Sequence, residues 1–83
     1  MDQNLAYLRE VLSNYTEENE MMMGIYQKIE HGHYPSEGAF VKGLSEEEIR
    51  SLENILDNEI NHANDAGDLE RGYQLNGVYE LLY

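Results

Sequence analysis

The stretch 5–29, which reads LAYLREVLSNYTEENEMMMGIYQKI, decides how we expect the chain to fold. Its apolar residues recur at alternating steps of three and four, the spacing that places side chains on one face of a helix. These residues are Leu5, Leu8, Leu12, Tyr15, Met22, Tyr26 and Ile29. The pattern predicts one long helix over residues 4–30, against which the shorter later segments must pack.

Asn19 takes the one position of this apolar face where a further apolar residue would be expected. It is either a solvated polar residue that the helix tolerates, or one half of a pair that fixes the register across a dimer axis. The adjacent Met21, Met22 and Met23 cannot all face one side of a helix. Either some of them belong to the core and the rest lie outside it, or they form an exposed patch that contacts a partner.

Local signals divide the rest of the chain. Gly32 and Pro35 end the first helix, and Ser36 is placed to cap a short helical turn over 36–42. Ser45 and Glu48 have the spacing of a capping box, which predicts a helix over 46–66 that stops before a glycine. We expect three apolar residues between these helices to close the end of the core: Phe40, Val41 and Leu44.

The last segment allows two interpretations. Asn76-Gly77 between apolar residues is a hairpin signal, whereas Asp68 is placed to cap a third helix over 69–82. One face of this helix would carry Leu69, Leu75, Val78, Tyr79 and Leu82, together with either Tyr73 or Gly72. A lone hairpin is only marginally stable, so we predict the helix. The expected fold is all-α: a single small three-helix domain over 1–83, with a long first helix and a short helical turn after it.

The composition is strongly acidic. Seventeen acidic and five basic residues give a formal charge of −12 over 83 residues, and there is no cysteine. Such a charge excludes direct binding to nucleic acid or to anionic lipid, and leaves a basic partner open. The sequence begins without a signal peptide and has no apolar run long enough to span a membrane, so we expect a cytoplasmic protein.

No residue pattern indicates an enzyme. The serines lack a histidine in a nucleophile context, and the glycines are not spaced to hold phosphate. His31, His33 and His62 match no zinc motif, so we expect neither metal nor cofactor.

Self-association is predicted from the length of the first helix. A helix of about 27 residues is some 40 Å long, more than one shorter helix covers. The apolar surface left over would be buried in a homodimer. The expected interface residues are Tyr15, Asn19, Met22, Met23 and Tyr26.

Scattered positions along the whole chain resemble a family of short sporulation-specific proteins, made in the developing forespore of bacilli. They are Met1-Asp2, Leu5, Tyr7-Leu8-Arg9-Glu10, Leu12-Ser13-Asn14, Phe40-Val41-Lys42, Glu59-Ile60, Leu75-Asn76 and Val78-Tyr79-Glu80-Leu81-Leu82. The family is sometimes named with the small acid-soluble spore proteins, but the motifs of the DNA-coating members are absent. The resemblance implies a spore-related role in the forespore, without a defined activity.

Two functions follow from these observations. The first is a non-enzymatic interaction protein, a small regulator or structural component that works through helical surfaces and an unknown protein partner. The alternative is an acidic mimic of nucleic acid, or an inhibitor of a basic DNA-binding protein. A mimic would need carboxylates in two rows at the spacing of phosphates.

Overall fold

The computed structural model describes residues 2–82, and its regular elements are all helical. They are α1 (Gln3–Leu12), α2 (Glu20–His31), α3 (Glu37–Lys42), α4 (Glu46–Asp65), α5 (Leu69–Tyr79) and a final 3₁₀ turn η1 (Glu80–Leu82). The predicted all-α class is confirmed. The three-helix description is wrong, because the structure has five α-helices within these residues.

The long first helix does not form. It is divided by a turn over 13–18, where the Ser13 hydroxyl donates to the carbonyl of Glu10 (2.6 Å) and the Thr16 hydroxyl to that of Ser13 (3.2 Å). Such local bonds offer the backbone an alternative to the helix ladder. The Asn19 side chain then accepts from the backbone N–H of Met22 (3.1 Å) and caps α2. Asn19 is therefore a helix start rather than a position on a continuous apolar face.

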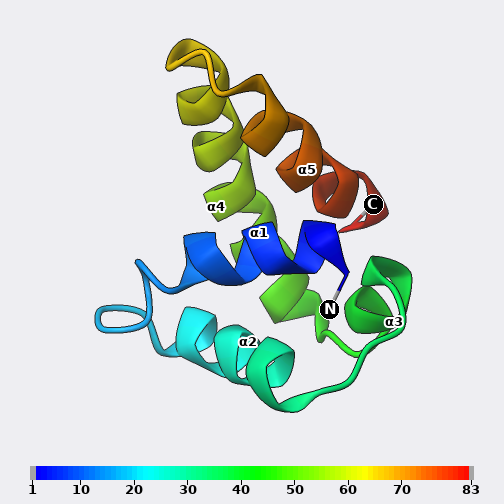
Figure 1. Ribbon diagram of the computed structural model, residues 1–83. Coiled ribbons are helices and arrows are strands. Elements are labelled where there is room, and N and C mark those ends of the chain that lie inside the picture. The colour runs from blue at the N-terminus through cyan, green and yellow to red at the C-terminus, as the bar shows by residue number, and fades with distance from the viewer. Residues whose placement is uncertain (1, 83) are drawn as a thin grey trace.

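The turn folds the two halves of the expected helix back on each other. Figure 1 shows α1 and α2 running side by side in opposite directions, with α4 and α5 forming a helical hairpin across them. The most extensive contact is between α4 and α5, followed by that between α1 and α5. The α4–α5 turn projects from the body at the top of the figure, far from α2 and α3. Gly67, at φ +77°, adopts the left-handed conformation that this turn requires.

The later helices begin where the local signals predict. The capping box is complete, because the N–H of Glu48 donates to the Ser45 hydroxyl (3.1 Å) and the N–H of Ser45 to the Glu48 carboxylate (2.9 Å). Ser36 caps α3 through the N–H of Ala39 (3.2 Å). Asp68 caps α5 through the N–H of Arg71 (3.2 Å), so the helical interpretation of the last segment is confirmed and the hairpin is not formed.

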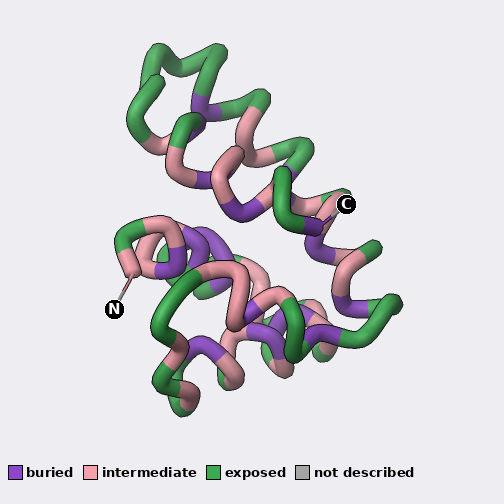
Figure 2. The backbone as a smooth tube through the Cα atoms, turned by 90° about the vertical axis from the view of Figure 1, so that its right-hand side faces the viewer, coloured by how far each residue is buried: buried purple, intermediate pink, exposed green. Residues whose placement is uncertain are grey.

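One apolar cluster joins all five helices. Figure 2 shows its buried residues where the helices face one another, and the exposed α4–α5 turn at the top. Its members are Leu5, Leu8, Val11, Leu12, Met22, Ile25, Ile29, Phe40, Leu44, Leu52, Leu56, Leu75, Val78 and Leu82. Phe40 and Leu44 are buried and Val41 packs against them, which confirms that these residues close the end of the core.

Candidate functional site

The predicted interface residues do not form one surface. Met22 has no exposed area and belongs to the core, so its expected place on a leftover apolar surface is wrong. Because α1 and α2 pack as a pair, each covers part of the other's apolar face. Asn19 is used as a helix cap, and Tyr15 and Tyr26 are half-buried. Of the five predicted interface residues, Met23 alone is exposed, at 37%. The apolar stripe that a homodimer was expected to cover is therefore reduced, on α2, to the exposed Met23 and the partly exposed Tyr26.

Tyr15 ties the turn after α1 to α4. Its hydroxyl donates a hydrogen bond to the carboxylate of Glu59. That bond, together with burial and the charge of Glu59, raises the pKa of Tyr15 to about 12. The residue therefore has a structural partner within the chain.

Tyr15→Phe is expected to lower the free energy of unfolding by about 1 kcal/mol, since it removes one hydrogen bond and leaves the ring in place. It should also remove the last tyrosine to ionise in an alkaline titration followed by tyrosinate absorbance. A Tyr15→Phe protein that still contains a tyrosine with a pKa near 12 would contradict this assignment.

Lys28 joins α2 to the start of α4. Its ammonium donates to the Glu48 carboxylate (2.7 Å) and to the carbonyl of Gly43 (3.2 Å). Burial alone would raise the pKa of Glu48, but the hydrogen bonds from Lys28 and from the N–H of Ser45 outweigh it, so the pKa is lowered. Glu48 therefore stabilises the fold as a carboxylate, and this contribution is lost as the pH falls through its lowered pKa.

Glu37, at the start of α3, lies against the beginning of α1. It accepts a hydrogen bond from the Asn4 side chain (2.9 Å). Burial raises its pKa, and the neighbouring Asp2 carboxylate raises it further, since two like charges oppose each other. The folded state therefore binds this proton more tightly than the unfolded chain does.

Glu37→Gln is expected to raise the melting temperature at neutral pH, because it removes a charge that the fold disfavours and leaves an acceptor for Asn4. The sign follows from the raised pKa: the charge opposes folding above that pKa, and the opposition disappears below the ordinary value of 4.5. Melting curves from neutral to acid pH measure the difference. The matched control is Glu17→Gln, the same change on an exposed residue of the turn. An equal shift at all pH values, or one shared by the control, would contradict the prediction.

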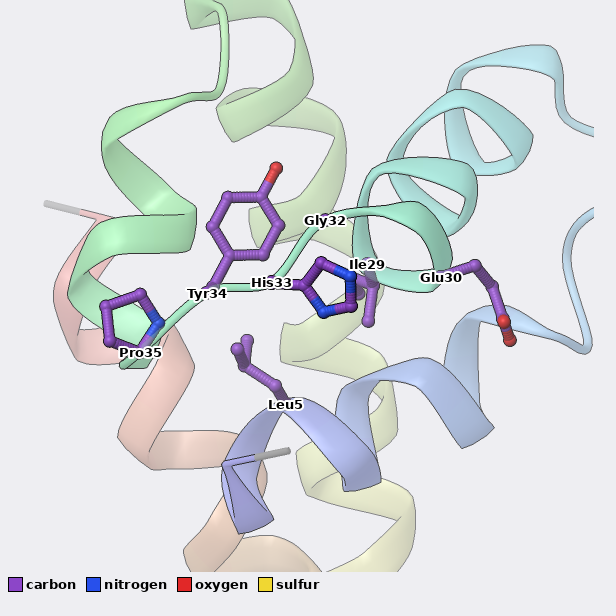
Figure 3. A pocket seen from close by; sticks show the side chains of 7 residues that line it. All are labelled: Leu5, Ile29, Glu30, Gly32, His33, Tyr34 and Pro35. Carbon is purple, nitrogen blue, oxygen red and sulfur yellow. The ribbon is translucent and has the colours of Figure 1, made fainter.

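A cavity of about 400 Å³ opens where the loop after α2 passes over α1. Figure 3 shows Leu5 rising from α1 toward the loop and the Glu30 carboxylate pointing away from it. The lining residues are Leu5, Ile29, Glu30, Gly32, His33, Tyr34 and Pro35. The lining is largely apolar, and its polar side chains are Glu30, His33 and Tyr34.

A second, more polar hollow of about 500 Å³ lies between α1 and α2. Its lining residues are Ala6, Tyr7, Arg9, Glu10, Ser13, Tyr26 and Glu30. Arg9 pairs with Glu30 across it (3.3 Å). A hydrogen bond to Glu30 and burial raise the pKa of Tyr26, while burial and the nearby Glu70 raise that of Tyr7. The hollow thus combines two tyrosines with two carboxylates and one arginine.

The most exposed large apolar side chains lie on α5. Leu69 is 69% and Tyr73 77% exposed, against 42% for Leu81. The sequence placed Leu69 with the core face and left open whether Tyr73 or Gly72 joined it. The structure buries Gly72 with Leu75 and Val78 and turns Leu69 and Tyr73 to solvent.

Potential metal ligands do not come together within residues 2–82: no group of three or more histidine, aspartate or glutamate side chains is arranged to hold an ion. His31, His33 and His62 are all exposed, at the end of α2, in the loop after it and near the end of α4. In the same part of the chain, no helix has the length and apolar character needed to cross a membrane.

These features define a small helical protein with an acidic surface. The chain belongs to the family described as CsgA, minor curli fiber component A, which matches residues 1–83. It is 44% identical over 82 residues to a protein of Bacillus subtilis (strain 168) named "Sigma-G-dependent sporulation-specific SASP protein", with 99% of each chain covered. This relative confirms the resemblance to sporulation-specific proteins of bacilli. No solved structure matches the chain significantly.

Proposed function

We propose that the protein has a non-enzymatic role in sporulation and acts by binding another protein. The relative supports the sporulation setting, because its name describes a sporulation-specific protein. On the same ground, we propose that this chain is located in the forespore.

The observation that carries the proposal is the excess of unpaired carboxylates. Four of the 17 acidic residues form ion pairs within residues 2–82, whereas three of the five basic residues do. The remaining carboxylates leave a surface whose field attracts cations and basic macromolecules. A protein partner with a basic surface would meet this field favourably.

The alternative, a mimic of nucleic acid, is not favoured by α4. The helix carries seven of the 17 acidic residues, but its exposed face also carries several asparagines and a basic residue. These interruptions are Arg50, Asn54, Asn58, Asn61 and Asn64. A mimic needs regular rows of carboxylates, and α4 does not provide one.

We do not propose that this chain forms the fibre named in the family description. Fibres of the cross-β type are built from stacked strands that pair along open edges. Residues 2–82 contain no strand, and their backbone bonds are used within helices and turns.

Capture from sporulating bacilli tests the proposed function. The immobilised protein is exposed to extracts of sporulating and of vegetative cells, in low and in high salt. We expect a basic protein to be retained from sporulating cells and released by salt, because the attraction is electrostatic. Retention of no protein in low salt would refute the proposal.

Self-association is a separate proposal, with a smaller surface than the sequence indicated. Met23 and Tyr26 remain at least partly exposed on α2, and a two-fold axis would repeat them on both subunits. Two chains of charge −12 repel each other, so added salt should tighten a dimer. Sedimentation at micromolar concentration in two salt conditions measures this, with Met23→Glu expected to return the mass to that of a monomer. A monomer under both conditions would contradict it.

A further inference from the structure

The first part of α5, next to the α4–α5 turn, carries an exposed apolar pair, Leu69 and Tyr73. Residues 64–70 are all exposed, and Leu69 and Tyr73 follow one helical turn apart on α5. Residues four apart on a helix are neighbours, so the two side chains form one small patch. Figure 2 shows this end of the hairpin standing clear of the other helices.

The patch cannot turn into the protein's own core. The opposite side of α5 is already filled, since Gly72, Leu75 and Val78 are buried there. A Cβ at Gly72 would lie 2.5 Å from the Asn64 side chain, which shows how closely α5 approaches α4. Leu69 and Tyr73 therefore stay on the outer side for as long as α5 is docked.

Carboxylates adjoin this apolar pair. Glu70 follows Leu69 in sequence, and Glu80 lies further along the same outer face, where it accepts from Asn76 (2.9 Å). The one basic residue of α5, Arg71, is already committed within the chain, because it pairs with Glu10 (2.9 Å) and Asp68 (3.3 Å). An apolar centre with an acidic rim is complementary to an apolar centre with a basic rim.

The acidic surface continues onto α1. Glu70 lies close enough to Tyr7 to raise the pKa of its hydroxyl, together with burial. Tyr7 also lines the 500 Å³ hollow, whose carboxylates Glu10 and Glu30 are already paired with Arg71 and Arg9. Lysine or arginine side chains reaching past Tyr73 would therefore meet the Glu70 carboxylate and the Tyr7 ring, and both groups attract cations.

We infer that the outer face of α5 is the docking surface for a basic amphipathic helix of a partner protein. This inference rests on the proposed function and adds the site and the chemistry of the partner. Leu69 and Tyr73 contact the apolar face of the partner helix, and Glu70 and Glu80 contact its basic flanks. A second copy of this chain does not fit this face of α5, because it would bring Glu70 and Glu80 of both copies against one another.

The first test uses a synthetic amphipathic helix with leucine on one face and lysine on the other, and purified full-length protein. Binding is measured by titration calorimetry, with a matched peptide in which glutamate replaces every lysine. We expect the lysine peptide to bind more weakly as salt rises, and the glutamate peptide not to bind. The double variant Leu69→Ser with Tyr73→Ser should lose at least about tenfold in affinity, as anchor residues do.

Two matched controls separate this surface from general effects. Met23→Ser removes an exposed apolar side chain on α2, away from this surface, and should leave the affinity unchanged. Glu70→Gln with Glu80→Gln should weaken the salt dependence, whereas Glu17→Gln with Glu18→Gln, the same charge change in the turn before α2, should not. Thermal melting followed by circular dichroism verifies that every variant is folded, as expected for exposed positions.

Several outcomes overturn the inference. They are absence of peptide binding, equal affinity of the Leu69/Tyr73 variant and its control, and a concentration-dependent dimer that only the Leu69/Tyr73 variant abolishes. The last result would assign the surface to a second copy. Capture from sporulating cells separates the two proposals: if this variant retains the same protein as the wild type, the docking surface is wrong and the proposed function stands. If the wild type retains no protein, the proposed function itself fails.

Discussion

Leu56→Ala is expected to lower the free energy of unfolding by about 2–5 kcal/mol. Leu56 has no exposed area and lies within the 20-residue helix α4, which packs against both α5 and α2. Truncation removes apolar contacts and leaves a cavity that these helices cannot close without moving. A domain of this size is stabilised by only about 4–12 kcal/mol, so the loss is a large share of the total. We expect the same range for Leu12→Ala, which is equally buried.

The matched control is Leu69→Ala, the same chemical change at a position that is 69% exposed. We expect it to alter stability by less than about 0.5 kcal/mol. Urea unfolding followed by circular dichroism compares the variants. A loss below about 1 kcal/mol for Leu56→Ala, or an equal loss for the control, would place Leu56 outside the core.

Helix starts were predictable from the sequence because each depends on one local hydrogen bond. Ser36, Ser45 and Asp68 each have a side-chain oxygen that accepts from a backbone N–H three residues ahead. That bond needs no information from distant parts of the chain. The starts of α3, α4 and α5 therefore follow from short stretches of sequence, whereas the predicted helix over 69–82 ends at Tyr79 and continues as the 3₁₀ turn η1.

The break in the first helix was missed because apolar spacing persists across it. Leu12, Tyr15 and Met22 keep steps that fit a continuous helix even though residues 13–18 form a turn. The signal that could have revealed the break was local. The hydroxyls of Ser13 and Thr16 donate hydrogen bonds to carbonyls three residues back, and the Asn19 side chain caps α2 by accepting from the Met22 N–H. Counting the period of apolar residues cannot distinguish a helix from two helices joined by a turn that preserves the period.

The exposed pair on α5 was missed for a different reason. Helical spacing shows which residues share a face, but it does not show which face another helix covers. On α5 two faces carry apolar residues, and the buried one is marked by Gly72, where α4 approaches closely. Leu69 and Tyr73 were therefore recognisable as a surface only once α4 was in place.

Phe40→Ala is expected to lower the free energy of unfolding by about 3–5 kcal/mol, and to release α3 from the body of the protein. α3 has only six residues, too few for a helix to be stable alone. Its buried side chain is Phe40, whose ring meets that of Tyr34 edge-on at 5.3 Å between centroids. Since α3 also packs against η1 and α5, loss of this ring should loosen the end of the chain as well.

Amide hydrogen exchange combined with urea unfolding measures both effects. We expect faster exchange in α3 and η1 than in the centre of α4, because a locally weakened segment opens more often than the whole domain does. Tyr73→Ala is the matched control: it deletes an aromatic ring that is 77% exposed and should leave both stability and exchange unchanged. If Phe40→Ala speeds exchange equally in every helix, α3 unfolds only together with the whole domain, and its separate attachment through Phe40 is refuted.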